Sequence, residues 1–280
     1  MYPILLDFGQ VTLFGLDLHL RISSYGFFYA LALVIGWLGL RKLGRERHPE
    51  APWTDIFFLS AIVGIVGGRI LNGLTVLPDV LAGRVPPYAI LVGGGVWLGG
   101  ALSGTAMYLY FMQRYRIEKG FGINALFTVM PLAHAIGRVG CFLGGCCYGA
   151  RCDFPWAVTF TSELAHKVNA TPLNVPLHPT QLYEIAVELI NFAICYSLWR
   201  RHARGWSIML IWFGLYGGQR FVLEFFRADY RGGIAWLSTS QWLSLGMLVV
   251  AATIVFTWVR RGTLLRRPAS AETAGTQSRK

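Results

Sequence analysis

The chain has 280 residues, of which 54% are hydrophobic and only 14% are charged, and its 25 basic and 14 acidic residues give a net charge of +11. Its long apolar runs lack polar residues at helical spacing, which argues against an ordinary soluble helical protein. The basic excess does not indicate nucleic-acid binding. It is concentrated in short connectors between apolar runs, where anionic inner-leaflet lipids attract it.

Seven segments are apolar and long enough to cross a bilayer as helices, which takes about 20 residues. The first, from Tyr25 to Leu40, carries no charge, whereas the fifth contains Glu184, Glu188 and Asn191. We therefore predict an all-α polytopic membrane protein with about seven transmembrane helices, at residues 23–40, 55–77, 88–112, 121–143, 182–199, 206–226 and 236–259.

Basic residues predict the orientation of these helices. Lys and Arg accumulate in the cytoplasmic loops of membrane proteins, and 16 of the 25 basic residues follow the first, third, fifth or seventh predicted helix. The N-terminus is therefore expected outside and the C-terminus in the cytoplasm. The 16 residues are Arg41, Lys42, Arg45, Arg47, Arg114, Arg116, Lys119, Arg200, Arg201, Arg204, Arg260, Arg261, Arg266, Arg267, Arg279 and Lys280.

One transmembrane domain over residues 1–267 accounts for nearly the whole chain. The longest connection, at about 144–180, is expected on the outer, periplasmic side, and connections of this length are often functional. Residues 268–280 are small and polar, which predicts a disordered cytoplasmic tail.

Arginines inside apolar segments are the strongest functional signal. A charge inside a membrane is costly, which makes Arg69, Arg138 and Arg220 candidate site residues. Guanidinium groups bind phosphate in a bidentate fashion, and these arginines outnumber the obvious carboxylate partners, so we expect a cavity for a lipid phosphate. Glu224 follows Arg220 by four residues, a spacing that allows a structural ion pair.

Histidines and tyrosines near the arginines have both structural and functional interpretations. His134 shares a helical face with Arg138 and is either a packing residue or a proton acceptor. His178 precedes the fifth helix, where a hydrogen bond that fixes the loop is the simpler role. Tyr25 and Tyr29 are either interfacial aromatic residues or phenol donors to a lipid head group.

Four of the five cysteines, Cys141, Cys146, Cys147 and Cys152, cluster where the fourth predicted helix meets the outer loop. A disulfide is permitted there. The spacing does not match common zinc motifs, and no metal is predicted. A nucleophilic thiolate activated by Arg138 is a third possibility, and packing of small side chains is the fourth. Cys195 is expected in the core.

Several motifs together resemble the prolipoprotein diacylglyceryl transferase family. They are Gly-Arg-Val-Gly-Cys-Phe at 137–142 with its continuation to 149, His-Pro-Thr-Gln-Leu-Tyr-Glu at 178–184, Ser-Tyr-Gly at 24–26, Arg-Phe-Val-Leu-Glu-Phe-Phe-Arg at 220–227, Gly-Gly-Arg at 67–69 and Gly-Gly at 99–100. The resemblance implies transfer of an sn-1,2-diacylglyceryl group from phosphatidylglycerol to the lipobox cysteine of a prolipoprotein signal peptide. Glycerol 1-phosphate would leave, and no cofactor is implied.

The resemblance also implies site residues and a location. Arg138, Arg220, His134, Tyr25 and Glu224 are the expected catalytic residues. Substrate would be bound by Arg138, Arg220, Tyr25, Arg69, His178, Gly99, Gly100 and Cys141. The protein would lie among the lipids of the bacterial inner membrane, with its site toward the periplasm.

The chain departs from the family pattern at two notable positions. Cys141 replaces the usual asparagine of the arginine motif, and Leu98 replaces a histidine that is one of the family's proposed catalytic groups. We expect His134 to replace that histidine as proton acceptor. Two alternatives remain open: a transferase with another acceptor and a Cys141 or Cys146 thiol intermediate, and a non-catalytic lipid-binding membrane protein.

Overall fold

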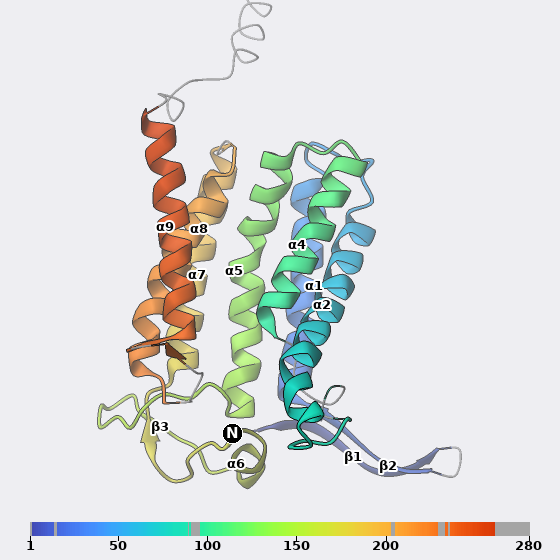
Figure 1. Cartoon of the computed structure of the whole chain (residues 1–280), viewed down its shortest axis with the longest axis vertical. Coiled ribbons are helices and arrows are strands. Elements are labelled where there is room, and N and C mark those ends of the chain that lie inside the picture. The colour runs from blue at the N-terminus through green and yellow to red at the C-terminus, as the bar shows by residue number, and fades with distance from the viewer. Residues whose placement is uncertain are drawn as a thin grey trace, which may run out of the picture.

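A computed structural model gives the fold, and it describes residues 2–13, 16–88, 90, 96–202, 205–228, 233–234 and 236–260. Seven long helices in these ranges form an elongated bundle (Figure 1). They are α1 (Ser24–Gly44), α2 (Trp53–Leu81), α4 (Trp97–Arg114), α5 (Lys119–Gly144), α7 (Thr180–Arg200), α8 (Ser207–Leu223) and α9 (Thr239–Arg260).

Each long helix coincides with one of the seven predicted segments, and the all-α polytopic fold is confirmed. By length and composition α1, α2, α5, α7 and α9 can each cross a membrane. With 18 and 17 residues, α4 and α8 lie at the lower limit of the usual range of about 17–25. The third helix begins later than predicted, at Trp97, and residues 89 and 91–95 before it lie outside the described ranges.

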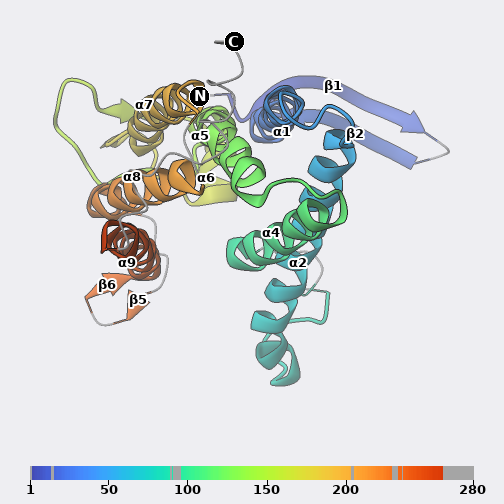
Figure 2. The same cartoon turned by 90° about the horizontal axis from the view of Figure 1, so that it is seen from above.

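Helix α5 lies at the centre of the bundle, between α1 and α7, and α8 packs against α5, α7 and α9. The pair α2 and α4 lies to one side, next to α1, as Figure 2 shows from above. Large buried side chains such as Leu40, Trp53, Met112, Phe121 and Ile208 form the main core. Their burial supplies the packing that holds α5 in place.

Glycines allow α2 and α4 to approach closely. A Cβ atom on Gly99 would lie 2.6 Å from the carbonyl oxygen of Gly67, and a Cβ atom on Gly67 would lie 2.9 Å from the carbonyl oxygen of Gly99. Backbones at this distance leave no room for a side chain, as in other small-residue contacts between membrane helices.

The start of α1 and the end of α5 lie beside the connection at 145–179, and each has a common type of helix cap. The Ser23 hydroxyl accepts a hydrogen bond from the backbone N–H of Gly26 at 3.0 Å, which starts α1. Gly145, with φ of 78°, ends α5 in the left-handed conformation that glycine favours. The connection contains α6 (Glu163–Asn169) and a two-stranded sheet of β3 (Val158–Thr159) and β4 (Pro176–Leu177).

An antiparallel hairpin of β1 (Ile4–Leu13) and β2 (Leu16–Ser23) precedes α1 and was not predicted. It extends sideways at the end of the bundle that holds α6 (Figure 1). Its apolar residues do not alternate regularly, and Phe8 is 60% exposed, so the sequence offers no clear strand period. The backbone N–H of Gly9 and the ring of His19 hydrogen-bond the Asp7 carboxylate and lower its pKa.

The remaining elements are the one-turn helix η1 (Glu224–Phe226) and the strands β5 (Gly233–Ile234) and β6 (Leu237–Ser238) before α9. The predicted tail at 268–280 lies outside the described residues.

Candidate functional site

A cavity of about 1080 Å³ opens where α5 ends and α1 and α9 begin. The basic residues Arg41, Arg114, Arg200 and Arg260 lie in the last turns of α1, α4, α7 and α9, at the opposite end of the bundle. The polar lining includes Arg21, Tyr25, Tyr29, His134, Arg138, Cys141, Cys146, Cys147, Asn169, Tyr216, Arg220, Ser240 and Ser244, and the apolar lining includes Leu164, Val168, Leu243 and Met247.

Arg138 projects from the last two turns of α5 and meets a carboxylate from α7. Its Nη2 atom lies 2.9 Å from Oε1 of Glu184, whose side chain is 1% exposed. The Arg138 side chain itself is 13% exposed and lines the cavity. The carboxylate therefore anchors the guanidinium from the buried side, while the cavity side stays open.

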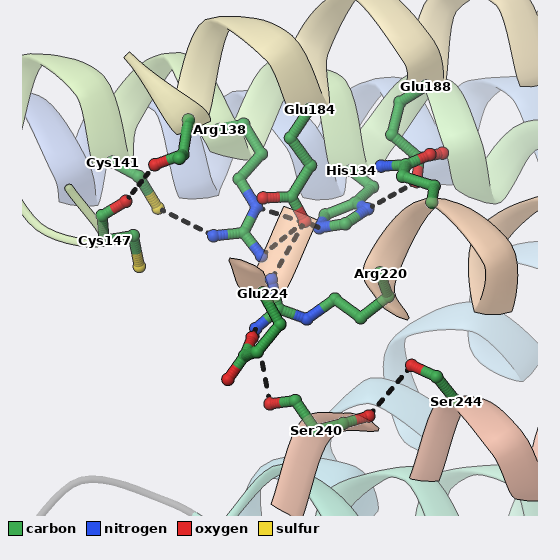
Figure 3. Close-up of polar contacts among 12 residues, drawn as sticks. His134, Arg138, Cys141, Cys147, Glu184, Glu188, Arg220, Glu224, Ser240 and Ser244 are labelled. Atoms are coloured by element: carbon green, nitrogen blue, oxygen red, sulfur yellow. Dashed lines mark hydrogen bonds and ion pairs between the residues drawn. The ribbon is translucent and has the colours of Figure 1, made fainter. Parts of the chain in front are cut away.

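Arg220 projects from the last turn of α8 toward the same carboxylate oxygen. Its Nη1 atom lies 4.0 Å from Oε1 of Glu184, so the two guanidinium groups converge from different helices (Figure 3). Its Nη2 atom lies 3.2 Å from Oε2 of Glu224 and 3.4 Å from the hydroxyl of Ser240. The predicted pairing of Arg220 with Glu224 is confirmed.

His134 lies one turn before Arg138 and is held at both ring nitrogens. The Nε–H group of Arg138 donates to Nε2 of His134 at 3.1 Å. Since a guanidinium only donates, Nε2 must accept, and the proton of the neutral ring is on Nδ1. That nitrogen lies 3.2 Å from Oε1 of the fully buried Glu188. The ring is thereby oriented toward Arg138.

The charge balance differs from the sequence expectation. Arginines were expected to outnumber their carboxylate partners, but three carboxylates, Glu184, Glu188 and Glu224, lie within 4.0 Å of Arg138, Arg220 or His134. The expectation was wrong because Glu184 and Glu188 project from α7 toward α5 and α8, a contact that separate helices in a sequence do not reveal. The buried charges thus largely offset each other.

Three cysteines form a compact cluster on the cavity wall. The Sγ atoms of Cys141, Cys146 and Cys147 all lie within 4.8 Å of one another, and none of these three cysteines forms a disulfide. The guanidinium of Arg138 reaches Cys141, with 3.9 Å from Nη1 to Sγ. Hydrogen bonds from the Cys141 and Cys146 thiols, together with the charges of Arg227 and Arg138, lower the pKa of Cys147. This arrangement favours a thiolate at Cys147.

Tyr25 and Tyr29 form one wall of the cavity. Their rings stack at a centroid distance of 6.2 Å, and both residues line the cavity from the first turns of α1. Gly140 allows this approach, because a Cβ atom there would lie 3.2 Å from the Cα atom of Tyr25. The absence of a side chain at Gly140 thus places Tyr25 beside the end of α5.

Comparisons with known proteins agree with this geometry. The family model described as prolipoprotein diacylglyceryl transferase matches residues 12–258. A phosphatidylglycerol–prolipoprotein diacylglyceryl transferase from Clostridium tetani is 34% identical, with 89% of this chain and 95% of the relative covered. Proteins named for the same activity from Clostridium perfringens and Zymomonas mobilis are 30% and 29% identical, covering 82% and 92% of this chain and 88% and 91% of the relatives.

The chain belongs to the prolipoprotein diacylglyceryl transferase family. The resemblance inferred from the motifs is therefore confirmed. Of the residues expected at the site, the structure brings Arg138, Arg220, His134, Tyr25 and Cys141 to one cavity. Glu224 contacts Arg220 but does not appear among the lining residues.

Other expected site residues of this family member lie outside the described lining of the cavity. Arg69 is exposed on α2, and Gly99 and Gly100 face α2 in the contact between α2 and α4. His178 hydrogen-bonds the hydroxyl of Tyr183 at 3.1 Å, while its backbone pairs with the loop at 149–150. Leu98, where the family usually has histidine, is 40% exposed on α4.

Glu184 and Glu188 are charges within the fifth apolar segment, but neither is among the site residues predicted from the sequence. Both are buried on α7, one turn apart. Two carboxylates at this spacing within an apolar segment are costly unless paired, which is the signal that could have identified them. Tyr216 and Ser240 also line the cavity, and their ordinary sequence contexts gave no such signal.

Proposed function

We propose that this chain transfers the sn-1,2-diacylglyceryl group of phosphatidylglycerol to the cysteine thiol of a prolipoprotein lipobox, with release of glycerol 1-phosphate. The convergence of Arg138 and Arg220 on one cavity wall carries this proposal. The names of the relatives support the same donor and acceptor. The bacterial inner membrane is the expected location, with the cavity toward the periplasm.

Arg138 and Arg220 would grip the phosphate of the donor lipid. The Arg138 guanidinium has five N–H donors, and its contacts with His134, Cys141 and Glu184 among the described residues engage three of them, so donors remain for a phosphate in the cavity. As the carbon–oxygen bond breaks, negative charge grows on the departing glycerol phosphate, and two fixed positive charges stabilise it. This stabilisation is strongest in a site from which water is excluded.

The walls of the cavity suit the two ends of such a lipid. Leu164, Val168, Leu243 and Met247 provide apolar surface, while Arg138 and Arg220 provide a charged one. The acyl chains of the lipid would contact the apolar surface, and its phosphate head group would contact the charged one. Tyr25 lines the same cavity, and its phenol can hydrogen-bond the head group.

His134 is better suited to positioning than to accepting a proton. Its Nε2 atom already accepts the Nε–H of Arg138, and its Nδ1 atom faces Glu188. A proton could reach Nε2 only if Arg138 moved away. We therefore assign His134 to holding the guanidinium of Arg138 in place, rather than to the role of the histidine that Leu98 replaces.

The experiment that tests the proposed function measures glycerol phosphate released from phosphatidylglycerol by the purified chain in the presence of a lipobox peptide. We expect release with a cysteine peptide and a thioether on that cysteine. Release should be absent with a serine peptide and with the Arg138→Gln variant. Binding of lipid without release from any peptide would instead support the alternative of a non-catalytic lipid-binding protein.

A thiol intermediate on Cys141 or Cys146 is chemically less favourable. Transfer to either thiol would form a thioether, and the second transfer would have to expel the cysteine thiolate, which is a poor leaving group from an alkyl carbon. Both thiols line the cavity, so the idea can be tested directly. Mass spectrometry of the chain during turnover should find no diacylglyceryl adduct on its own cysteines, and an adduct that forms and decays at the turnover rate would establish the intermediate.

A further inference from the structure

The triad of Cys141, Cys146 and Cys147 has the composition of a thiolate site for a metal ion. Its three Sγ atoms lie within 4.8 Å of one another. Tetrahedral zinc at about 2.3 Å from each sulfur would place the sulfurs about 3.8 Å apart. The sulfur atoms would need to approach by at most about 1 Å to reach this distance. Among the described residues, this is the group of three such ligands that lies close enough together to hold a metal ion.

The backbone around the triad is fixed independently of any ion. Cys141 lies in the last turn of α5, and its carbonyl accepts the backbone N–H of Cys146 at 3.1 Å. Thr180 and Gln181 donate to the carbonyls of Cys147 and Cys146, each at 2.7 Å. The start of α7 therefore holds the turn that carries two of the three thiols. Cys147 has φ of 64°, which is uncommon for a residue other than glycine.

Charge around the triad favours a thiophilic divalent ion. Three thiolates with one divalent cation carry a net charge of −1, and the Arg138 guanidinium lies 3.9 Å from the Cys141 sulfur to offset it. Soft thiolate ligands select zinc over magnesium or calcium. Three protein ligands leave a fourth position open, as in catalytic rather than structural zinc sites, and all three cysteines line the lipid cavity.

We propose that Cys141, Cys146 and Cys147 bind one zinc ion whose fourth position faces the cavity and receives the acceptor thiol. This inference rests on the proposed function for its substrate. A thiol bound to zinc loses its proton, so no protein base is needed where Leu98 replaces histidine. The zinc-bound sulfur attacks the glyceryl carbon, the carbon–oxygen bond to phosphate breaks, and glycerol phosphate leaves with the electron pair. The released thiol proton balances the charge gained by that phosphate.

Metal content of the full-length, untagged chain in detergent tests the site itself. We expect one zinc ion per reduced wild-type chain, and cobalt in its place should show thiolate-to-cobalt absorption. Cys141→Ser, Cys146→Ser and Cys147→Ser should each weaken binding at least tenfold, whereas the matched controls Cys152→Ser and Cys195→Ser should not. No stoichiometric ion, equal binding by the triad variants, or a disulfide within the triad in protein isolated from membranes would overturn the proposal.

The open position is tested with the cobalt-loaded chain. A lipobox peptide with cysteine should change the cobalt spectrum, and its serine counterpart should not; an unchanged spectrum with the cysteine peptide would overturn thiol activation. Glycerol phosphate release separates this inference from the proposed function. Release that survives chelation and the triad substitutions overturns the metal assignment alone. If the peptide thiol changes the cobalt spectrum but the chain releases no glycerol phosphate from phosphatidylglycerol, the proposed function alone is overturned.

Discussion

At the scale of single residues, Glu184 is the member of the site on which the others depend. Its buried carboxylate lies 2.9 Å from Arg138 and 4.0 Å from Arg220, and it offsets the repulsion between these two positive groups. Removal of one partner from a buried ion pair leaves an uncompensated charge, which costs about 3–5 kcal/mol.

Glu184→Gln should therefore both destabilise the protein and reduce release of glycerol phosphate. Thermal unfolding in detergent measures the first effect. Glu118→Gln is the matched control, because Glu118 is 63% exposed in its contact with Arg47 and an exposed pair contributes at most about 1 kcal/mol. Equal unfolding temperatures for the two variants would show that Glu184 does not hold the arginines together.

His134 gives a second prediction at this scale. His134→Gln keeps an oxygen that can accept the Nε–H of Arg138, whereas His134→Ala removes the acceptor. If His134 positions Arg138, the glutamine variant should keep most of the activity and an unchanged pH profile, while the alanine variant loses at least tenfold. Loss of one limb of the pH profile in His134→Gln would instead identify the ring as the proton acceptor.

At the scale of elements, the contact between α2 and α4 depends on the absence of side chains. Gly99→Ala would place a methyl group 2.6 Å from the Gly67 carbonyl, so the helices must separate, at a cost of about 1–3 kcal/mol. Gly246→Ala on α9 meets nothing within 4 Å and should be neutral or slightly stabilising. Thermal unfolding of both variants checks the difference, and an undiminished stability of Gly99→Ala would refute the close packing.

The N-terminal hairpin should loosen in acid. Asp7 has a lowered pKa because its carboxylate accepts hydrogen bonds from the Gly9 backbone and His19. A lowered folded pKa stabilises the hairpin above about pH 4, and this contribution is lost as the pH falls through that folded value. In the wild type, amide exchange of the hairpin, corrected for intrinsic rates, should accelerate as the pH falls through the folded pKa of Asp7. In Asp7→Asn the exchange should be fast both above and below that pH, and identical behaviour of the two chains would contradict the assignment.

The elements differ in how far the sequence predicts them. Long apolar runs predicted all seven helices, because burial in a membrane needs continuous apolar surface. The pairing of Arg220 with Glu224 followed from helical spacing alone. The sequence did not predict the hairpin, because its residues lack a clear strand period. It also did not predict the contact of Glu184 with Arg138, because this contact joins α7 to α5 across the bundle. Contacts between helices depend on packing that no local pattern encodes.

At the scale of the whole molecule, the site and the basic helix ends lie at opposite ends of the bundle (Figure 1). The predominance of basic residues in cytoplasmic loops predicts that the cavity end faces the periplasm. Alkaline phosphatase fused after Trp156 should therefore be active in cells, and phosphatase fused after Arg201 should be inactive. The reverse pattern would place the cavity in the cytoplasm.

Retention of phosphatidylglycerol by the purified chain, measured by native mass spectrometry, tests the grip on the lipid phosphate most directly. Charge-assisted hydrogen bonds contribute about 1.5–3 kcal/mol each, so Arg138→Gln and Arg220→Gln should each retain this lipid at least tenfold less well than the wild type. Arg69→Gln, altered on the exposed face of α2, should retain it fully. Undiminished retention by both cavity variants would contradict the account.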